Sequence, residues 1–472
     1  MSADYANLSG EIEDLKISAF DAYMCEVVHN SKNKYDFDIR GDSYLITYQK
    51  LIGPGDETGS LTISRPTKSE DKASGGGNIV SQEGRSDKIV EDLNRDFSVA
   101  FEEVCDRIER AMKSWRHLPD PDKISEVYTH IFKNISAMLA VPDGSVGPTG
   151  NSNIKTAFDL VPTPASVMSG TTWDAFCMKF YLKLPSAING TNGLAHYLAS
   201  IIQGESTMFE EARNNITSLV VNARTAFDSV ATSWKREVNW ENVIKVLAVV
   251  AEAATSVVTG VASGAARAAK TVVGGLKTLK QTMENAEEDK ETKTGNDYDS
   301  VMKAFEESIT SLGEKIRETE RGMAKNLDDN RQAAIDEPGH YDLTLESITT
   351  GSSDQLAIKS REDVTKVIKS QMPTISDELK EAMSAVEQLA VAFGSVVGRP
   401  DDIGVGRSGP LASFTGLAQL VRRYLGELSD EAALAGKNLE AAVNDIDAHD
   451  QASAQKLKEA QKNVDDHKAK YD

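Results

Sequence analysis

Apolar residues at alternating three- and four-residue steps recur along this chain and constrain its fold more than any other feature. The steps run through four long stretches, at residues 97–115, 209–234, 375–396 and 414–446. This spacing places an apolar stripe on one face of an α-helix, and such a helix gains most of its stability when other helices cover the stripe. The sequence therefore predicts an all-α fold, an elongated multi-helix bundle built from long antiparallel helical hairpins.

The N-terminal part breaks this pattern. Residues 1–86 form the first predicted domain, in which a helix over about 8–28 precedes short runs rich in Tyr, Ile, Thr and Phe. These runs lie within residues 33–64 and are separated by turn residues, so they predict a small β-like excursion. The polar, Gly/Ser-rich residues 65–87 predict a mobile loop.

Two further domains are expected. Residues 87–335 predict a helical bundle around a central hydrophobic helix at 243–280, and residues 336–472 predict a C-terminal helical hairpin. Within the bundle, the sequence LPDP predicts a helix start, with Asp120 as the cap and Pro121 in the first turn. Pro185 predicts a break or kink in the following helix.

The most apolar stretch, VIKVLAVVAEAATSVVTGVASGAA at residues 243–266, has three possible roles. Residues 246–266 are long enough to cross a bilayer of about 30 Å, yet they are rich in small residues and contain one carboxylate. A buried central strut of the bundle, a segment that enters a membrane conditionally and a permanent anchor all fit this composition. The candidate membrane residues are Val249, Glu252, Val257, Gly260 and Gly264.

Composition and motifs argue against several classes of function. The chain carries 52 basic and 73 acidic side chains, and its net charge of −21 repels nucleic acid. The three cysteines and seven histidines have neither the spacing of a zinc site nor that of a nucleophile with its base. We therefore expect no enzymatic activity, no metal and no cofactor. The N-terminus has no apolar signal sequence, so export would need a signal-peptide-independent route.

Six large side chains are the best candidates for packing or for binding another protein. Trp115 and Trp173 are expected to be packing anchors, and Pro119 is expected to form the turn beside the first of them. Four residues share one face of the last helix and predict either a partner-facing stripe or part of the chain's own core. These residues are Leu417, Val421, Tyr424 and Leu428.

Two segments resemble proteins of the actinobacterial type VII secretion system. SGTTWDAFCMKFY, with Trp173 just ahead of a long helix, resembles the second arm of the WXG-type substrates. The segment from Gly409 to Leu457 resembles the second arm of the ESX secretion-associated hairpin proteins, with His449, Asp450, Ala454 and Leu457 at its end. Ala175 stands where the WXG motif has Gly, and the family's C-terminal export tag is missing.

Two functions follow as expectations. The resemblance implies a non-enzymatic helical protein that pairs with a helical partner or with itself and is secreted or held at the cell surface, with a cytoplasmic location as the alternative. The apolar stretch instead predicts a helical pore-forming or membrane-remodelling protein that conditionally inserts residues 246–266.

Overall fold

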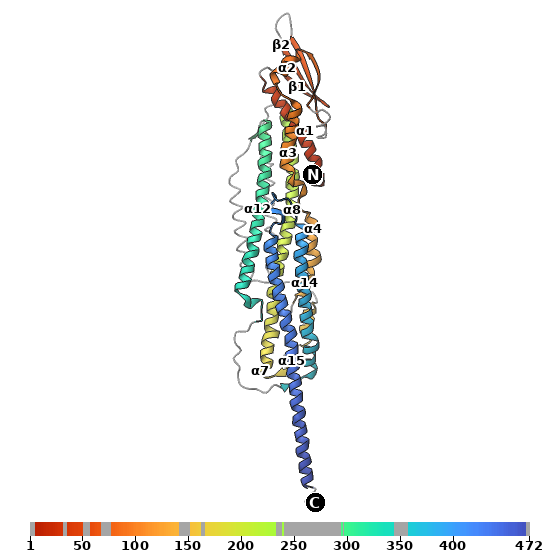
Figure 1. Cartoon of the computed structure of the whole chain (residues 1–472), viewed down its shortest axis with the longest axis vertical. Helices are drawn as coiled ribbons and strands as arrows, with labels where there is room; N and C mark the ends of the chain where they lie inside the picture. The colour runs from red at the N-terminus through yellow and green to blue at the C-terminus, as the bar shows by residue number, and fades with distance from the viewer. Residues whose placement is uncertain are drawn as a thin grey trace.

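The computed structural model shows a long, mostly helical rod with a small sheet at one end (Figure 1). It describes residues 5–31, 35–50, 57–67, 77–140, 152–161, 166–232, 238–239, 294–295, 297–343 and 357–468. The mostly helical fold with a small sheet is the one predicted from the apolar spacing. The central helix predicted at 243–280 lies outside the described residues.

The sheet is an antiparallel meander in the order β1-β2-β3-β4. Its strands are β1 (Asp36–Arg40), β2 (Ser43–Lys50), β3 (Glu57–Ser64) and β4 (Ile79–Gly84). Tyr44, Ile46 and Ile63 are buried at the face covered by α1 (Leu8–His29) and α2 (Ser86–Leu93). We call β1–β4 and α2 the head.

β4 corrects the expectation of a loop throughout residues 65–87. Every residue of this strand is exposed, so its sequence, IVSQEG, has no alternation of buried and exposed positions to reveal it. Its backbone pairs with β3 across a bulge at Thr62 and Ile63. Backbone pairing rather than burial therefore holds the strand.

One continuous helical segment forms the spine of the rod. It comprises α7 (Thr171–Cys177), the π-helical turn Met178–Lys183 and α8 (Leu184–Thr232). These 62 residues span about 90 Å at about 1.5 Å per residue. The predicted break at Pro185 is absent, because the wider turn just before it accommodates a residue that cannot donate a backbone hydrogen bond. Pro373 follows a second π-helical turn, Val367–Gln371, in the same way.

The other helices pack around this spine. Near the head these are α1, α3 (Phe97–Met112) and the first half of α12 (Tyr298–Asp336). Along the other half these are α4 (Pro121–Val127), α5 (Lys133–Met138), α6 (Asn153–Asp159), α14 (Met372–Val396) and α15 (Leu411–Lys468). As predicted, Asp120 caps α4 by accepting from the Asp122 N–H, with Pro121 in the first turn.

Several short elements complete the described chain. They are the 3-10 turns Tyr5–Asn7, Ser114–His117, Pro338–His340 and Gly406–Ser408, the π-helical turn Tyr128–Phe132, the helix α13 (Arg361–Lys366) and the strands β5 (Met168–Ser169), β6 (Val238–Asn239), β7 (Thr294–Gly295) and β8 (Ala357–Ile358). β5 pairs with β8, and β6 pairs with β7, both antiparallel.

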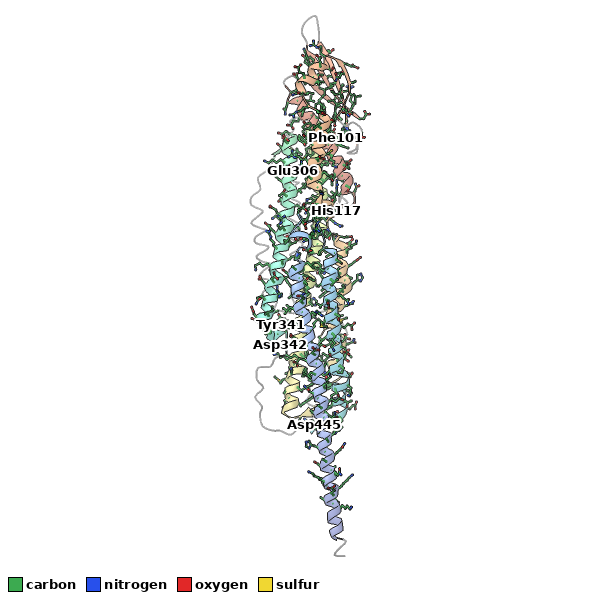
Figure 2. All side chains as sticks on the ribbon, in the orientation of Figure 1. Phe101, His117, Glu306, Tyr341, Asp342 and Asp445 are labelled. Atoms are coloured by element: carbon green, nitrogen blue, oxygen red, sulfur yellow. The ribbon has the colours of Figure 1, made fainter. Side chains whose placement is uncertain are left out.

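A single connected core runs through the rod and includes residues from all three predicted domains. The last helix leaves this core near its end. Asp445 marks the point where α15 extends beyond the other helices (Figure 2), and residues 448–462 are all exposed. Within the described residues, no helix combines the length and the apolar content needed to cross a membrane.

Candidate functional site

The loop between α14 and α15, residues 397–410, contacts α8, α12 and the turn Ser114–His117 at mid-length of the rod. Gly404 and Gly409 have positive φ values of +68° and +51°, which glycine adopts without the penalty of a β-carbon. A β-carbon at Gly404 would overlap the Glu320 carboxylate, and one at Gly409 would overlap the Arg399 guanidinium. Both glycines are therefore required for the close approach of this loop to the helices.

Arg399 carries the only fully buried charge of this loop among the described residues and points into the rod. Its guanidinium donates to Glu320 of α12 and lies 3.4 Å from Oε2 of Glu205 of α8. All three side chains have an exposed fraction of 0%. The face of the guanidinium lies 5.0 Å from the centre of the Phe209 ring. We call Glu205, Glu320 and Arg399 the buried charge cluster.

The two carboxylates of the cluster are not equivalent. Glu320 accepts from Arg399 and from the Val405 N–H. Glu205 has the longer contact with Arg399, and its Oε1 has no hydrogen-bond partner within the described residues. Burial, and secondly the Glu320 carboxylate, raise the pKa of Glu205 to about 8. Burial also raises the pKa of Glu320, although Arg399 and the Val405 N–H act in the opposite direction.

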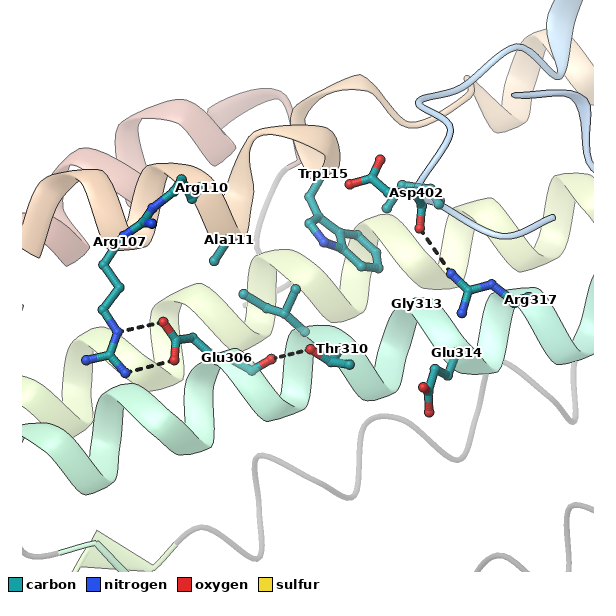
Figure 3. Close-up of a pocket in the computed structure, with 12 residues that line it drawn as sticks. Arg107, Arg110, Ala111, Trp115, Glu306, Thr310, Gly313, Glu314, Arg317 and Asp402 are labelled. Atoms are coloured by element: carbon teal, nitrogen blue, oxygen red, sulfur yellow. Dashed lines mark hydrogen bonds and ion pairs between the residues drawn. The ribbon is translucent and has the colours of Figure 1, made fainter. Parts of the chain in front are cut away.

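A cavity of about 550 Å³ lies beside the same loop, between α3, the Trp115 turn and α12 (Figure 3). One wall is the two-point ion pair between Arg107 and Glu306, with N–O distances of 2.6 and 2.8 Å. The opposite end is the loop, where Arg317 donates to the Gly404 carbonyl at 3.1 Å and Ser114 donates to the Asp402 carboxylate at 2.6 Å.

The cavity has the size of a small-molecule site but not a one-signed charge. Its lining includes three arginines, Arg107, Arg110 and Arg317, and three carboxylates, Glu306, Glu314 and Asp402. These charges balance, and Arg107 and Arg317 are already engaged by protein oxygens. The contacts around the cavity mainly connect α3, α12 and the loop.

A serine and a histidine, the residue types of a nucleophile and its base, meet between α5 and α8. The Ser136 hydroxyl lies 3.1 Å from Nε2 of His196, whose ring packs edge-on against Phe132. Burial lowers the pKa of His196, and Ser136 is only 2% exposed. Neither side chain lines the cavity of Figure 3, so we interpret the pair as a hydrogen bond within the core. Within the described residues, no group of three or more His, Cys, Asp or Glu could hold a metal ion.

The packing residues chosen from the sequence are all buried. Trp115 is 4% exposed and lines the cavity, and its carbonyl accepts from the Tyr5 hydroxyl at 2.6 Å. Pro119 is buried in the turn that follows. Trp173 is 2% exposed and stacks on Phe176 at 5.0 Å. The structure does not bring Trp115 and Trp173 together, since they lie in different halves of the rod.

The stripe on the last helix faces the chain's own core, the second of the two roles expected for it, and not a partner. Leu417, Val421, Tyr424 and Leu428 are between 0% and 2% exposed. Tyr424 stacks on Tyr341 at 5.3 Å and donates to the Ala334 carbonyl at 2.7 Å. The candidate membrane residues lie outside the described residues: Val249, Glu252, Val257, Gly260 and Gly264.

The buried charge cluster was not among the residues chosen from the sequence, but a signal for it exists. Glu205 lies four residues after Ile201 and four before Phe209, and Glu320 lies four residues after Ile316. Both carboxylates therefore occupy positions of an apolar stripe, where a charge needs a buried partner. Nothing local in the sequence shows that this partner is Arg399, 79 residues beyond Glu320.

Comparison of the whole chain with protein-family models, characterised proteins and solved structures finds no match.

Proposed function

We propose that this is a helical pore-forming or membrane-remodelling protein whose apolar stretch, residues 246–266, enters lipid bilayers. The observation that carries the proposal is the pairing of β6 with β7, in which Val238 is opposite Gly295 and Asn239 is opposite Thr294. Because the two strands are adjacent, the ends of the segment 240–293 are held together at one place on the rod. The apolar stretch lies within this intervening segment of the sequence.

The rod next to β6 and β7 is held by contacts among its own helices. Tyr298, the first residue of α12, packs against Tyr23 of α1 at 5.4 Å and Phe227 of α8 at 5.8 Å. Its backbone N–H donates to Glu26 at 2.7 Å. These contacts join α1, α8 and α12 without residues 240–293. Entry of residues 246–266 into a bilayer therefore need not break these contacts, as conditional insertion requires.

The charge of the protein sets the lipid it should prefer. A net charge of −21 repels anionic headgroups at long range. Binding to neutral bilayers should therefore be stronger than binding to anionic bilayers, and this difference should be largest at low ionic strength, where the repulsion is least screened. The favourable free energy must then come from transfer of the apolar side chains of residues 246–266 into the bilayer.

Dye release from vesicles of neutral phosphatidylcholine tests the proposal. We expect leakage with the wild-type chain and a loss of about 100-fold with Val257→Asp, because a central aspartate costs about 3 kcal/mol more to insert than valine. Val391→Asp is the matched control, since Val391 is 71% exposed on α14 and the same substitution there should leave leakage unchanged. Absence of leakage by the wild-type chain at every pH and lipid composition would refute the function.

The projecting end of α15 favours a second candidate, a helical protein that acts by pairing with another helix and is exported without a cleaved signal peptide. The part of α15 after Asp447 packs on no other described helix, and an isolated helix is only marginally stable in water. A partner helix would therefore stabilise it. A second copy of this chain is the simplest partner. Sedimentation velocity should then show concentration-dependent association that disappears when the chain ends at Asp447; identical behaviour of the two chains would exclude self-pairing through this end.

A further inference from the structure

Three charged side chains meet where the α14–α15 loop crosses α8 and α12, and their number is odd. Two carboxylates, Glu205 and Glu320, converge on one guanidinium, that of Arg399, and none of the three is exposed to solvent. With both carboxylates ionised, the site would hold one uncompensated negative charge in a medium that solvates charge poorly. The site therefore favours a state in which the two carboxylates share one proton.

The geometry indicates which carboxylate holds the proton. Glu320 receives hydrogen bonds from Arg399 and from the Val405 N–H, both of which stabilise its ionised form. Glu205 has one long contact of 3.4 Å with Arg399 and an unpaired Oε1. Glu205 is thus the protonated member, and Glu320 and Arg399 form the ion pair.

Among the described residues, none supplies Glu205 with a second cation. On α12, Arg317 is directed to the loop, where it donates to the Gly404 carbonyl, and its charge acts on Glu320. On the α4 side, Ser206 donates to the Pro121 carbonyl, and Arg213 lies 3.6 Å from Asp120. These neighbours already have partners of their own.

We propose that the buried charge cluster is a pH-sensitive latch: one shared proton keeps the α14–α15 loop docked on α8 and α12, and loss of that proton releases the loop. The loop is the only described connection between α14 and α15, and Arg399 is its one deeply buried charge. When Glu205 ionises, it competes with Glu320 for Arg399 and leaves one carboxylate without a counter-ion. The Val405 N–H contact and the Arg317 contacts, which depend on the same loop position, then weaken together.

The direction of the pH effect follows from the sign of the shift. The pKa of Glu205 is raised to about 8 in the folded protein. A carboxylate with a raised pKa stabilises the docked state fully below its ordinary pKa of 4.5; that contribution is lost progressively as the pH rises and is gone above the raised value. The loop is therefore held most strongly on acidification, and its release increases with pH up to about pH 8. This inference concerns the bundle itself and does not depend on whether residues 246–266 enter membranes.

Hydrogen exchange of residues 397–410, measured by mass spectrometry from pH 6 to pH 9.5 with labelling times corrected for the intrinsic rate, tests the latch. In the wild-type chain we expect protection of this loop to fall by up to tenfold per pH unit as the pH rises towards about 8 and to level off above it, where Glu205 is ionised in both the docked and the released states. Protection of α3 amides should not change in the same range.

Variants identify the group responsible. Glu205→Gln keeps the shape of the side chain without its titration, so loop protection should stay within twofold up to pH 9.5. Glu320→Gln should also remove the fall in protection up to about pH 8, because Glu205 then becomes the sole counter-ion of Arg399. Glu210→Gln, at an exposed position of the same helix, is the control and should behave like wild type. A flat wild-type profile, or a fall in protection that survives in Glu205→Gln, would overturn the proposal.

Discussion

Two glycines of the α14–α15 loop differ in what surrounds them, although both have positive φ. At Gly409 a β-carbon would overlap the Arg399 guanidinium, whereas at Gly406, with φ of +66°, nothing lies within 4 Å. The first glycine is required by packing and by backbone geometry, and the second by backbone geometry alone. A comparison of substitutions at the two glycines therefore separates the contribution of the buried charge cluster to stability from the contribution of the turn.

Substitution of each glycine by alanine gives a measurable difference in stability. Gly406→Ala should lower the free energy of unfolding by about 1 kcal/mol, the cost of a left-handed alanine. Gly409→Ala should lower it by about 3 kcal/mol or more, because it also displaces Arg399 from a buried ion pair. Urea denaturation followed by circular dichroism measures both. Equal effects of the two substitutions would mean that Arg399 can move without loss of stability.

The apolar stripe of α15 shows how far a helix can be interpreted from its sequence. The spacing of Leu417, Val421, Tyr424 and Leu428 correctly predicts that they share one face, but it cannot tell whether that face meets another molecule or the same chain. In the structure, α12 and α14 cover it.

Leu417→Ala should therefore destabilise the chain itself. Leu417 is 0% exposed, and its truncation should lower the free energy of unfolding by about 2–5 kcal/mol. Leu434, 52% exposed on the same helix, is the matched control, and its truncation should cost about 0.5 kcal/mol or less. Thermal denaturation distinguishes them. If Leu417→Ala left the Tm unchanged, packing of the stripe would not contribute to the stability of the core.

The sequence predicts the helices well where one face is buried. It does not predict features that depend on backbone pairing, on a local change of helix type or on contacts between distant residues. The stripes of α3, α12, α14 and α15 follow the expected spacing because each of these helices buries one face, whereas α1 and the first half of α8 are buried on more than one face. β4 was not predicted because none of its side chains is buried. The break predicted at Pro185 is absent because a π-helical turn precedes this residue. The buried charge cluster joins residues up to 194 positions apart, a pairing that no local pattern contains.

The rod as a whole behaves as two overlapping bundles that share one spine. α8 packs with α1 near the head and with α4 and α15 farther along, where α14 packs on α4 and α15, while α12 contacts both groups. The α14–α15 loop crosses the spine where the two groups meet, next to Trp115 and the cavity. The junction therefore depends on a few polar contacts, whereas each bundle is held by extensive apolar packing.

The place of residues 240–293 in this architecture decides between the interpretations of the apolar stretch. Because Asn239 and Thr294 are paired, a four-residue Gly/Ser linker can replace residues 240–293 as a hairpin turn. If the apolar stretch is not part of the core, the shortened chain should fold with a Tm within about 2 °C of wild type, since its core contacts are unchanged. It should also release no dye from neutral vesicles.

The control for this replacement is the chain ending at Asp447, which removes the exposed end of α15 and should keep both the Tm and the leakage. A shortened chain that fails to fold, while the truncated one folds, would show that the apolar stretch fills the bundle as a buried strut. In that case the membrane function would fail with it, because the free energy gained in the bilayer would have to exceed the packing lost from the core.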